Sequence, residues 1–145
     1  MTYIATGAAV VAAIALMASS ALAHPDPDSA SSKEMTYVKG ATAKNIKSMN
    51  EPGVEAFFED IVSSKDPKAP ISCALFRIKK SEPLKYAYDY DDAKIILDGE
   101  ITVTDGKSTV TATKGDVLLF PKGATITFST PSEGLAFACG QRPSE

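Results

Sequence analysis

Four residues near the middle of the chain have types and spacing that suit chemistry. Tyr86 and Tyr88 stand two positions apart, as do Asp92 and Lys94. Because successive side chains of a strand point to opposite faces, each pair would share one face. A carboxylate beside an amine can act as a base, and a lysine in an apolar pocket can have a lowered pKa. With tyrosines as proton donors, this set predicts acid–base chemistry on a small, partly apolar molecule.

The same residues also have a structural interpretation. Asp92 and Lys94 could be an ion pair that satisfies two partly buried charges. Tyr86 and Tyr88 could be ordinary strand residues, since tyrosine favours strands. A Schiff base through Lys94 is a further, more speculative interpretation. The residue types alone leave these alternatives open.

The elements that would position these residues are indicated by turn signals and alternating polarity. Eight strands are predicted, over 71–78, 84–88, 93–97, 100–104, 108–113, 117–120, 125–129 and 135–139. The Asp-Gly pairs at 98–99 and 105–106 predict hairpin turns, and residues 114–116 predict another turn. Eight short strands at this spacing favour a sandwich or a closed barrel.

One short helix is expected before the strands. Four apolar residues recur at helical spacing over 54–62, namely Val54, Phe57, Phe58 and Ile61. This pattern predicts an amphipathic helix that lies outside the barrel. Residues 65–70 hold two prolines and predict a loop.

Residues 1–23 differ in composition from the rest of the chain. They carry no charge, and Ala21-Leu22-Ala23 resembles a cleavage site, so we expect a secretory signal peptide cleaved after Ala23. An uncleaved membrane anchor is the alternative. Residues 24–35 are rich in Pro, Asp and Ser and predict a flexible linker, which leaves one domain over 36–145. We therefore expect a secreted or extracytoplasmic protein without a stable membrane partner.

Charge, histidine and cysteine content limit the partners and metals. The net charge is −3, and the chain has no evident basic patch, so no nucleic-acid partner is expected. The only histidine is His24, and no CxxC motif is present. Cys73 and Cys139 each lie in an alternating run. They could form a disulfide if those strands are neighbours, or they could be two small buried hydrophobic residues.

Three segments of the chain together resemble a known family. The runs 88–100, 115–128 and 134–142 are similar to cupins related to the ethanolamine-utilisation protein EutQ. The resemblance covers residues 36–142. It implies an all-β fold, a single cupin (jelly-roll) barrel with a short N-terminal helix. It also implies a homodimer, since cupins of this size often pair through the strands of one sheet.

The cupin motifs also imply where a metal would be bound. Their carboxylate position falls on Asp92, two histidine positions fall on or near Tyr86 and Tyr88, and the last histidine position is Ile126. Zinc, iron, copper and nickel prefer imidazole or thiolate ligands. We therefore expect no metal and no other cofactor.

The resemblance further implies an inward-facing pocket for a small-molecule ligand or substrate. The residues expected to carry catalysis are Tyr86, Tyr88, Asp92 and Lys94. The residues expected to line the pocket are Phe76, Phe120, Ile126 and Phe128. The function we expect is that of a metal-independent lyase, isomerase or cyclase. The alternatives are a non-catalytic binding module and a metal-dependent cupin with atypical ligands.

Overall fold

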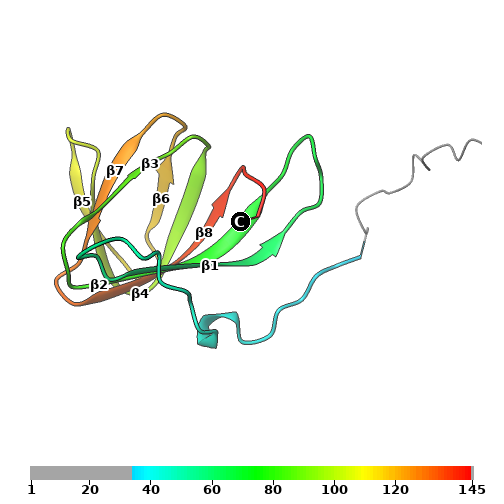
Figure 1. The fold of residues 1–145 in the computed structure, drawn as a ribbon, viewed down its shortest axis with the longest axis horizontal. Coiled ribbons are helices and arrows are strands. Elements are labelled where there is room, and N and C mark those ends of the chain that lie inside the picture. The colour runs from blue at the N-terminus through cyan, green and yellow to red at the C-terminus, as the bar shows by residue number, and fades with distance from the viewer. Residues whose placement is uncertain (1–33, 145) are drawn as a thin grey trace, which may run out of the picture.

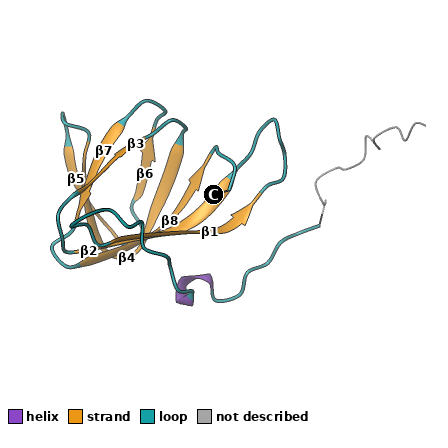
Figure 2. Cartoon of the chain, in the orientation of Figure 1, coloured by secondary structure: helices purple, strands orange, loops and turns teal. Residues whose placement is uncertain are grey.

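The computed structural model describes residues 34–144, so the expected signal peptide and most of the linker lie outside the described residues. The described part begins with a single 3-10 turn, η1 (Ala41–Ala43), followed by strands. The strands are β1 (Ala56–Ser63), β2 (Ser72–Lys79), β3 (Leu84–Ala87), β4 (Asp92–Thr104), β5 (Thr109–Thr113), β6 (Val117–Phe120), β7 (Thr125–Ser129) and β8 (Glu133–Gly140). Figure 2 shows how fully strands dominate this region.

The strands form two antiparallel layers that share one long strand. One layer runs β1-β2-β8-β4-β6, and the other runs β3-β7-β4-β5. β4 belongs to both layers, so the sheet curls round on itself, as Figure 1 shows. The all-β barrel predicted from the sequence is confirmed.

The hairpin predicted at residues 98–99 is wrong, because β4 continues through that point. The register between β4 and β8 shifts between Ile96 and Asp98, which marks a bulge. Gly99 follows with φ +64°, and a Cβ there would lie 2.1 Å from the carbonyl oxygen of Glu133. The two strands predicted over 93–97 and 100–104 are therefore one bent strand that passes from one layer to the other. The turns predicted at 105–106 and 114–116 are confirmed, since they connect β4 to β5 and β5 to β6.

The helix predicted over 54–62 is also wrong, because these residues form β1. This strand pairs with β2 from Ala56, opposite Ile78, to Ser63, opposite Ser72. β1 is apolar on both faces: Ala56 and Phe58 meet the core between the layers, whereas Phe57 and Ile61 pack on the outer side. A bulge between Asp60 and Val62 also shifts the alternation of side chains between the two faces of the strand. Apolar residues on both faces of a bulged strand can imitate helical spacing.

The main core fills the space between the two layers. Its buried members include Phe76, Ile96, Ile101 and Phe128, from three different strands. A smaller cluster lies on the outer side of the first layer, where Ile46 covers Leu75 and Leu135. The segment before β1 therefore covers part of that outer face. No helix within residues 34–144 is long and apolar enough to cross a membrane.

A disulfide joins Cys73 to Cys139, which decides between the two interpretations of the cysteines. The two residues lie directly opposite each other on β2 and β8. The bond links positions 66 residues apart in sequence. It therefore fixes the pairing of the central strands on which the pocket is built.

Candidate functional site

The inner face of β8 consists only of small residues, and this makes room for larger side chains from β4. The four residues are Gly134, Ala136, Ala138 and Gly140. Lys94 pairs with Ala138, and Asp92 pairs with Gly140. A Cβ at Gly140 would lie 2.6 Å from the Tyr90 ring and 3.2 Å from Asp92 Oδ1. The absence of a side chain there allows Tyr90 and Asp92 to pack side by side.

A cavity of about 460 Å³ opens between β1, β2, β3 and β4. Five of its lining residues are aromatic, and these are Phe58, Phe76, Tyr86, Tyr88 and Tyr90. The polar and charged lining residues are Lys47, Ser48, Glu59, Asp60 and Lys94. Lys94 also lines the cavity and is its most deeply buried cation, with 4% of the residue exposed. Cavities of this size and character suit small molecules whose apolar body is oriented by a few polar groups.

Lys94 and Asp92 form a buried ion pair. The distance from Lys94 Nζ to Asp92 Oδ2 is 2.8 Å, and Asp92 is also only 4% exposed. Lys94 lines the cavity, whereas Asp92 is not among the lining residues. The amine also lies 5.3 Å from the ring centroid of Phe76 and 5.9 Å from that of Tyr88.

The surroundings of Lys94 favour its neutral form more than water does. Burial lowers the pKa of Lys94, and the positive charge of Arg142 lowers it further. The charge of Asp92 acts in the opposite direction, as does its hydrogen bond to the amine. On balance the pKa is lowered, so the amine gives up its proton more readily than an exposed lysine does.

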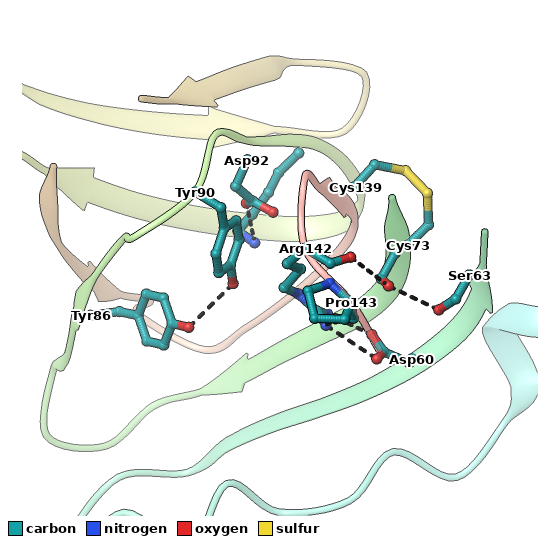
Figure 3. A network of polar contacts seen from close by, with 11 residues as sticks. Asp60, Ser63, Cys73, Tyr86, Tyr90, Asp92, Cys139, Arg142 and Pro143 are labelled. Carbon is teal, nitrogen blue, oxygen red and sulfur yellow. Dashed lines mark hydrogen bonds and ion pairs between the residues drawn. A yellow bond between two sulfur atoms is a disulfide. The ribbon is translucent and has the colours of Figure 1, made fainter. Parts of the chain in front are cut away.

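Three tyrosines form a cluster beside this pair. The hydroxyls of Tyr86 and Tyr90 are 3.2 Å apart, as Figure 3 shows, and the Tyr88 ring meets both neighbouring rings edge-on. Burial raises the pKa of Tyr88, and the negative charge of Asp92 raises it further. Burial also raises the pKa of Tyr90, together with its hydrogen bond to Tyr86. The Tyr88 and Tyr90 phenols therefore keep their protons at neutral pH.

Sequence reasoning did not identify Tyr90, although the series Tyr86, Tyr88 continues to it at the same spacing of two. It also did not identify the pair Asp60 and Arg142. Arg142 is 6% exposed and donates to Asp60 at 2.5 and 3.2 Å, as Figure 3 shows. Its guanidinium lies 5.1 Å from the ring centroid of Phe58. The partners are 82 residues apart, so no local pattern could have linked them.

The structure divides the expected pocket-lining residues into two groups. Phe76 lines the cavity. Phe120, Ile126 and Phe128 belong to the buried core and are not among the lining residues. Phe120 stacks on Tyr88 with ring centroids 5.3 Å apart, so it supports the cavity wall from behind.

The residues present do not fit the transition metal that the cupin motifs imply. Among residues 34–144, no three His, Cys, Asp or Glu side chains gather in a group that could hold a metal ion. The motif positions carry Tyr86, Tyr88, Asp92 and Ile126, and the one carboxylate is paired with Lys94. Phenols, one engaged carboxylate and an alkyl group are a poor ligand set for zinc, iron or copper.

The two curled layers with a pocket between them form the barrel fold of the cupins. Solved cupin structures have a similar fold. Within that class, the model of the family described as "Ethanolamine utilisation protein EutQ" matches residues 11–138, and the chain belongs to this family.

Three similar proteins show how far the likeness extends. The Clostridium difficile EutQ structure is 19% identical with a TM-score of 0.65, over 75% of this chain and 81% of that one. The polyketide cyclase RemF from Streptomyces resistomycificus is 15% identical with a TM-score of 0.61, over 73% and 79%. The protein named acetate kinase EutQ, from Salmonella typhimurium, is 38% identical over 47 residues. That match spans 32% of this chain and only 20% of that protein.

Proposed function

We propose that this protein is a metal-independent enzyme that catalyses proton transfer on a small carbonyl compound, as a lyase, isomerase or cyclase. One observation carries the proposal. The amine of Lys94 is almost fully buried, yet it lines an aromatic cavity and has a carboxylate 2.8 Å behind it. Buried amines with lowered pKa values are suited to general base catalysis near neutral pH.

The site offers groups for both halves of such a reaction. Lys94, in its neutral form, takes a proton from the carbon next to the carbonyl. The electron pair of that C–H bond moves toward the carbonyl oxygen. One hydroxyl of the Tyr86–Tyr90 pair, both members of which line the cavity, donates a hydrogen bond to the enolate oxygen. Asp92 then stabilises the ammonium that Lys94 has become. Asp92 is thus a positioning residue, because it contacts Lys94 and does not itself line the cavity.

The comparisons support only part of this proposal. RemF is named as a polyketide cyclase and shares the fold, which supports a cyclase as one of the three reaction types. The acetate kinase match covers too little of its relative to bring that activity here. The chemistry proposed for this chain therefore rests on its own cavity residues.

A non-catalytic binding module is the second candidate function. It is favoured by the closeness of Lys94 to Asp92, because a 2.8 Å ion pair already satisfies both charges. In that case the cavity would hold a small apolar ligand, and Lys94 would contribute at most a hydrogen bond.

Deuterium exchange distinguishes the two functions without knowledge of the natural substrate. Phenylacetone, phenylacetaldehyde and cyclohexanone are incubated with the protein in D₂O, and loss of the α-proton signal is followed by NMR. We expect exchange above background for at least one compound. It should fall to background in Lys94→Met and in the double variant Asp92→Asn/Lys94→Met, which avoids an unpaired carboxylate. Lys85→Met is the matched control, since Lys85 is exposed on β3. Binding without exchange by the parent protein would favour the binding module.

Secretion and dimer formation are further proposals. The apolar, uncharged segment 1–23 supports secretion, and N-terminal sequencing of secreted material should begin at His24. A homodimer would bury the exposed apolar residues on the outer side of β4 and β6, which are Ile95, Val117 and Leu119. Light scattering on the purified protein should give twice the monomer mass, and Leu119→Lys should reduce it to the monomer.

A further inference from the structure

We infer that Lys94 is a carbonyl-trapping lysine, which forms a covalent imine with an aldehyde or ketone held in the aromatic cavity. This inference rests on the proposed function, because it assigns the same cavity to carbonyl compounds. It goes further by giving the amine a nucleophilic role.

The position of Lys94 separates it from the other cavity lysine. Lys47 stands at the cavity with 80% of its side chain exposed and a salt bridge of 3.1 Å to Glu59. The side chain of Lys94 is 4% exposed and reaches the cavity from its buried wall. A ligand that fills the cavity therefore meets one nearly dehydrated amine. Desolvation in an apolar pocket is a recognised way to activate a lysine nucleophile.

The charged groups around Lys94 supply the proton that imine formation needs. The ion pair of Lys94 and Asp92 is equivalent, after one proton transfer, to a neutral amine beside a carboxylic acid. The amine nitrogen attacks the carbonyl carbon, a C–N bond forms, and the carbonyl oxygen leaves as water. One amine, one carboxylic acid and one carbonyl compound thus give an iminium, a carboxylate and one water. No external oxidant, reductant or acid is required.

The product of this step would be stabilised by groups already in place. The iminium carries one positive charge where the ammonium was, so the carboxylate of Asp92 still neutralises it. The rings of Phe76 and Tyr88 lie within 6 Å of the nitrogen, a distance at which aromatic faces attract cations. Arg142 acts the other way, because its positive charge disfavours a positive charge on Lys94. Arg142 is itself paired with the carboxylate of Asp60.

The walls of the cavity define the class of carbonyl compound. Aromatic rings from Phe58, Phe76 and Tyr86 favour a flat, apolar body. One hydroxyl of the Tyr86–Tyr90 pair can donate to a second oxygen of the substrate, since the other donates within the pair. The predicted substrate is therefore an aryl or alicyclic aldehyde or ketone with a second oxygen atom.

Reductive trapping tests the inference directly. The protein is incubated near neutral pH with benzaldehyde and sodium cyanoborohydride, which reduces an imine to a stable benzylamine. Peptide mapping by mass spectrometry then gives the labelling rate at each lysine. A lysine whose pKa is lowered carries more neutral amine at this pH, and the neutral amine is the form that attacks a carbonyl carbon. We therefore expect Lys94 to be labelled several-fold faster than Lys85.

One competitor and the α-proton exchange assay together make the outcome decisive. Cyclohexanecarboxylic acid, which has an alicyclic body but no ketone or aldehyde, should protect Lys94 and leave the labelling of Lys85 unchanged. A Lys94 that is labelled no faster than Lys85 overturns the inference. If that result is found while the parent protein still catalyses α-proton exchange, proton transfer by Lys94 stands and only the covalent step fails. If exchange is also absent, the proposed function fails as well.

Discussion

The amine of Lys94 lies 2.8 Å from the carboxylate of Asp92, and each residue is only 4% exposed. The pair stands on the inner face of β4, opposite Ala138 and Gly140 of β8. Larger residues at those two positions would occupy the volume that the pair fills. The energetic consequence is that each charge depends on the other, because an isolated buried charge is very unfavourable.

This dependence predicts strong coupling between substitutions of the pair. Lys94→Met leaves a buried carboxylate without its partner and should lower the free energy of unfolding by about 3–5 kcal/mol. Asp92→Asn/Lys94→Met removes both charges and should cost clearly less than the sum of the single changes. Urea unfolding of the parent, both single variants and the double variant measures the coupling as a double-mutant cycle. Additive losses would mean that the two charges do not depend on each other.

The tyrosine cluster predicts an unusual alkaline titration. In the folded protein the pKa values of Tyr88 and Tyr90 are raised. In the unfolded chain the two phenols have the ordinary tyrosine pKa of about 10. Above that pH the unfolded state therefore holds fewer protons than the folded state. The stability contributed by these phenols is complete below about pH 10 and declines as the pH rises beyond it.

Ultraviolet absorbance of tyrosinate, recorded beside circular dichroism, measures this behaviour. Tyr88 and Tyr90 should ionise only together with unfolding. In Tyr90→Phe the absorbance change that accompanies unfolding should shrink by one tyrosine. Ionisation of all tyrosines before any loss of structure would contradict the burial of this cluster.

Much of the fold could be predicted from the sequence because most strands alternate cleanly and end at turns. β6 matches its predicted bounds of 117–120, and β7 matches 125–129. Two errors arose where local patterns have two meanings. An Asp-Gly pair marks hairpins, but Gly99 serves a bend inside β4. Likewise, β1 imitates a helix because both of its faces are covered by apolar side chains.

The candidate site could be predicted only where it is local in sequence. Tyr86, Tyr88, Asp92 and Lys94 fall within nine positions, and alternation was enough to group them. Which of these side chains lines the cavity depends on how the layers pack. Only the structure therefore shows that Lys94 lines the cavity and Asp92 does not. The pair of Asp60 and Arg142 depends on a contact between β1 and the residues after β8, which no spacing rule predicts.

The disulfide between Cys73 and Cys139 predicts a large effect of reduction on stability. It closes a loop of 66 residues, and restriction of the unfolded chain by such a loop contributes about 4 kcal/mol. Thermal unfolding with and without reductant should show a lower Tm in the reduced parent. Cys73→Ser/Cys139→Ser should unfold at the lower Tm in both conditions. If reductant lowers the Tm of this double variant equally, the effect does not come from the disulfide.

The crowding around Gly99 in the bend of β4 predicts that substitution of this glycine destabilises the fold more than substitution of Gly106, which is not crowded. Gly99 and Gly106 both have positive φ, at +64° and +86°. A Cβ at Gly99 would meet the backbone of Glu133 at 2.1 Å, whereas nothing lies within 4 Å of a Cβ at Gly106. Gly106→Ala should therefore cost about 1 kcal/mol for its backbone conformation alone.

Gly99→Ala should cost at least about 2 kcal/mol more than the control, because either β4 or β8 must move to relieve the contact. Urea unfolding of the two variants measures the difference. The same movement should reach the pair on β4, since Lys94 lies five residues before Gly99 on a continuous strand. Folded Gly99→Ala protein should therefore also trap benzaldehyde at Lys94 more slowly than Gly106→Ala does. Equal stabilities for the two variants would show that the crowding at Gly99 does not hold β4 in its bend.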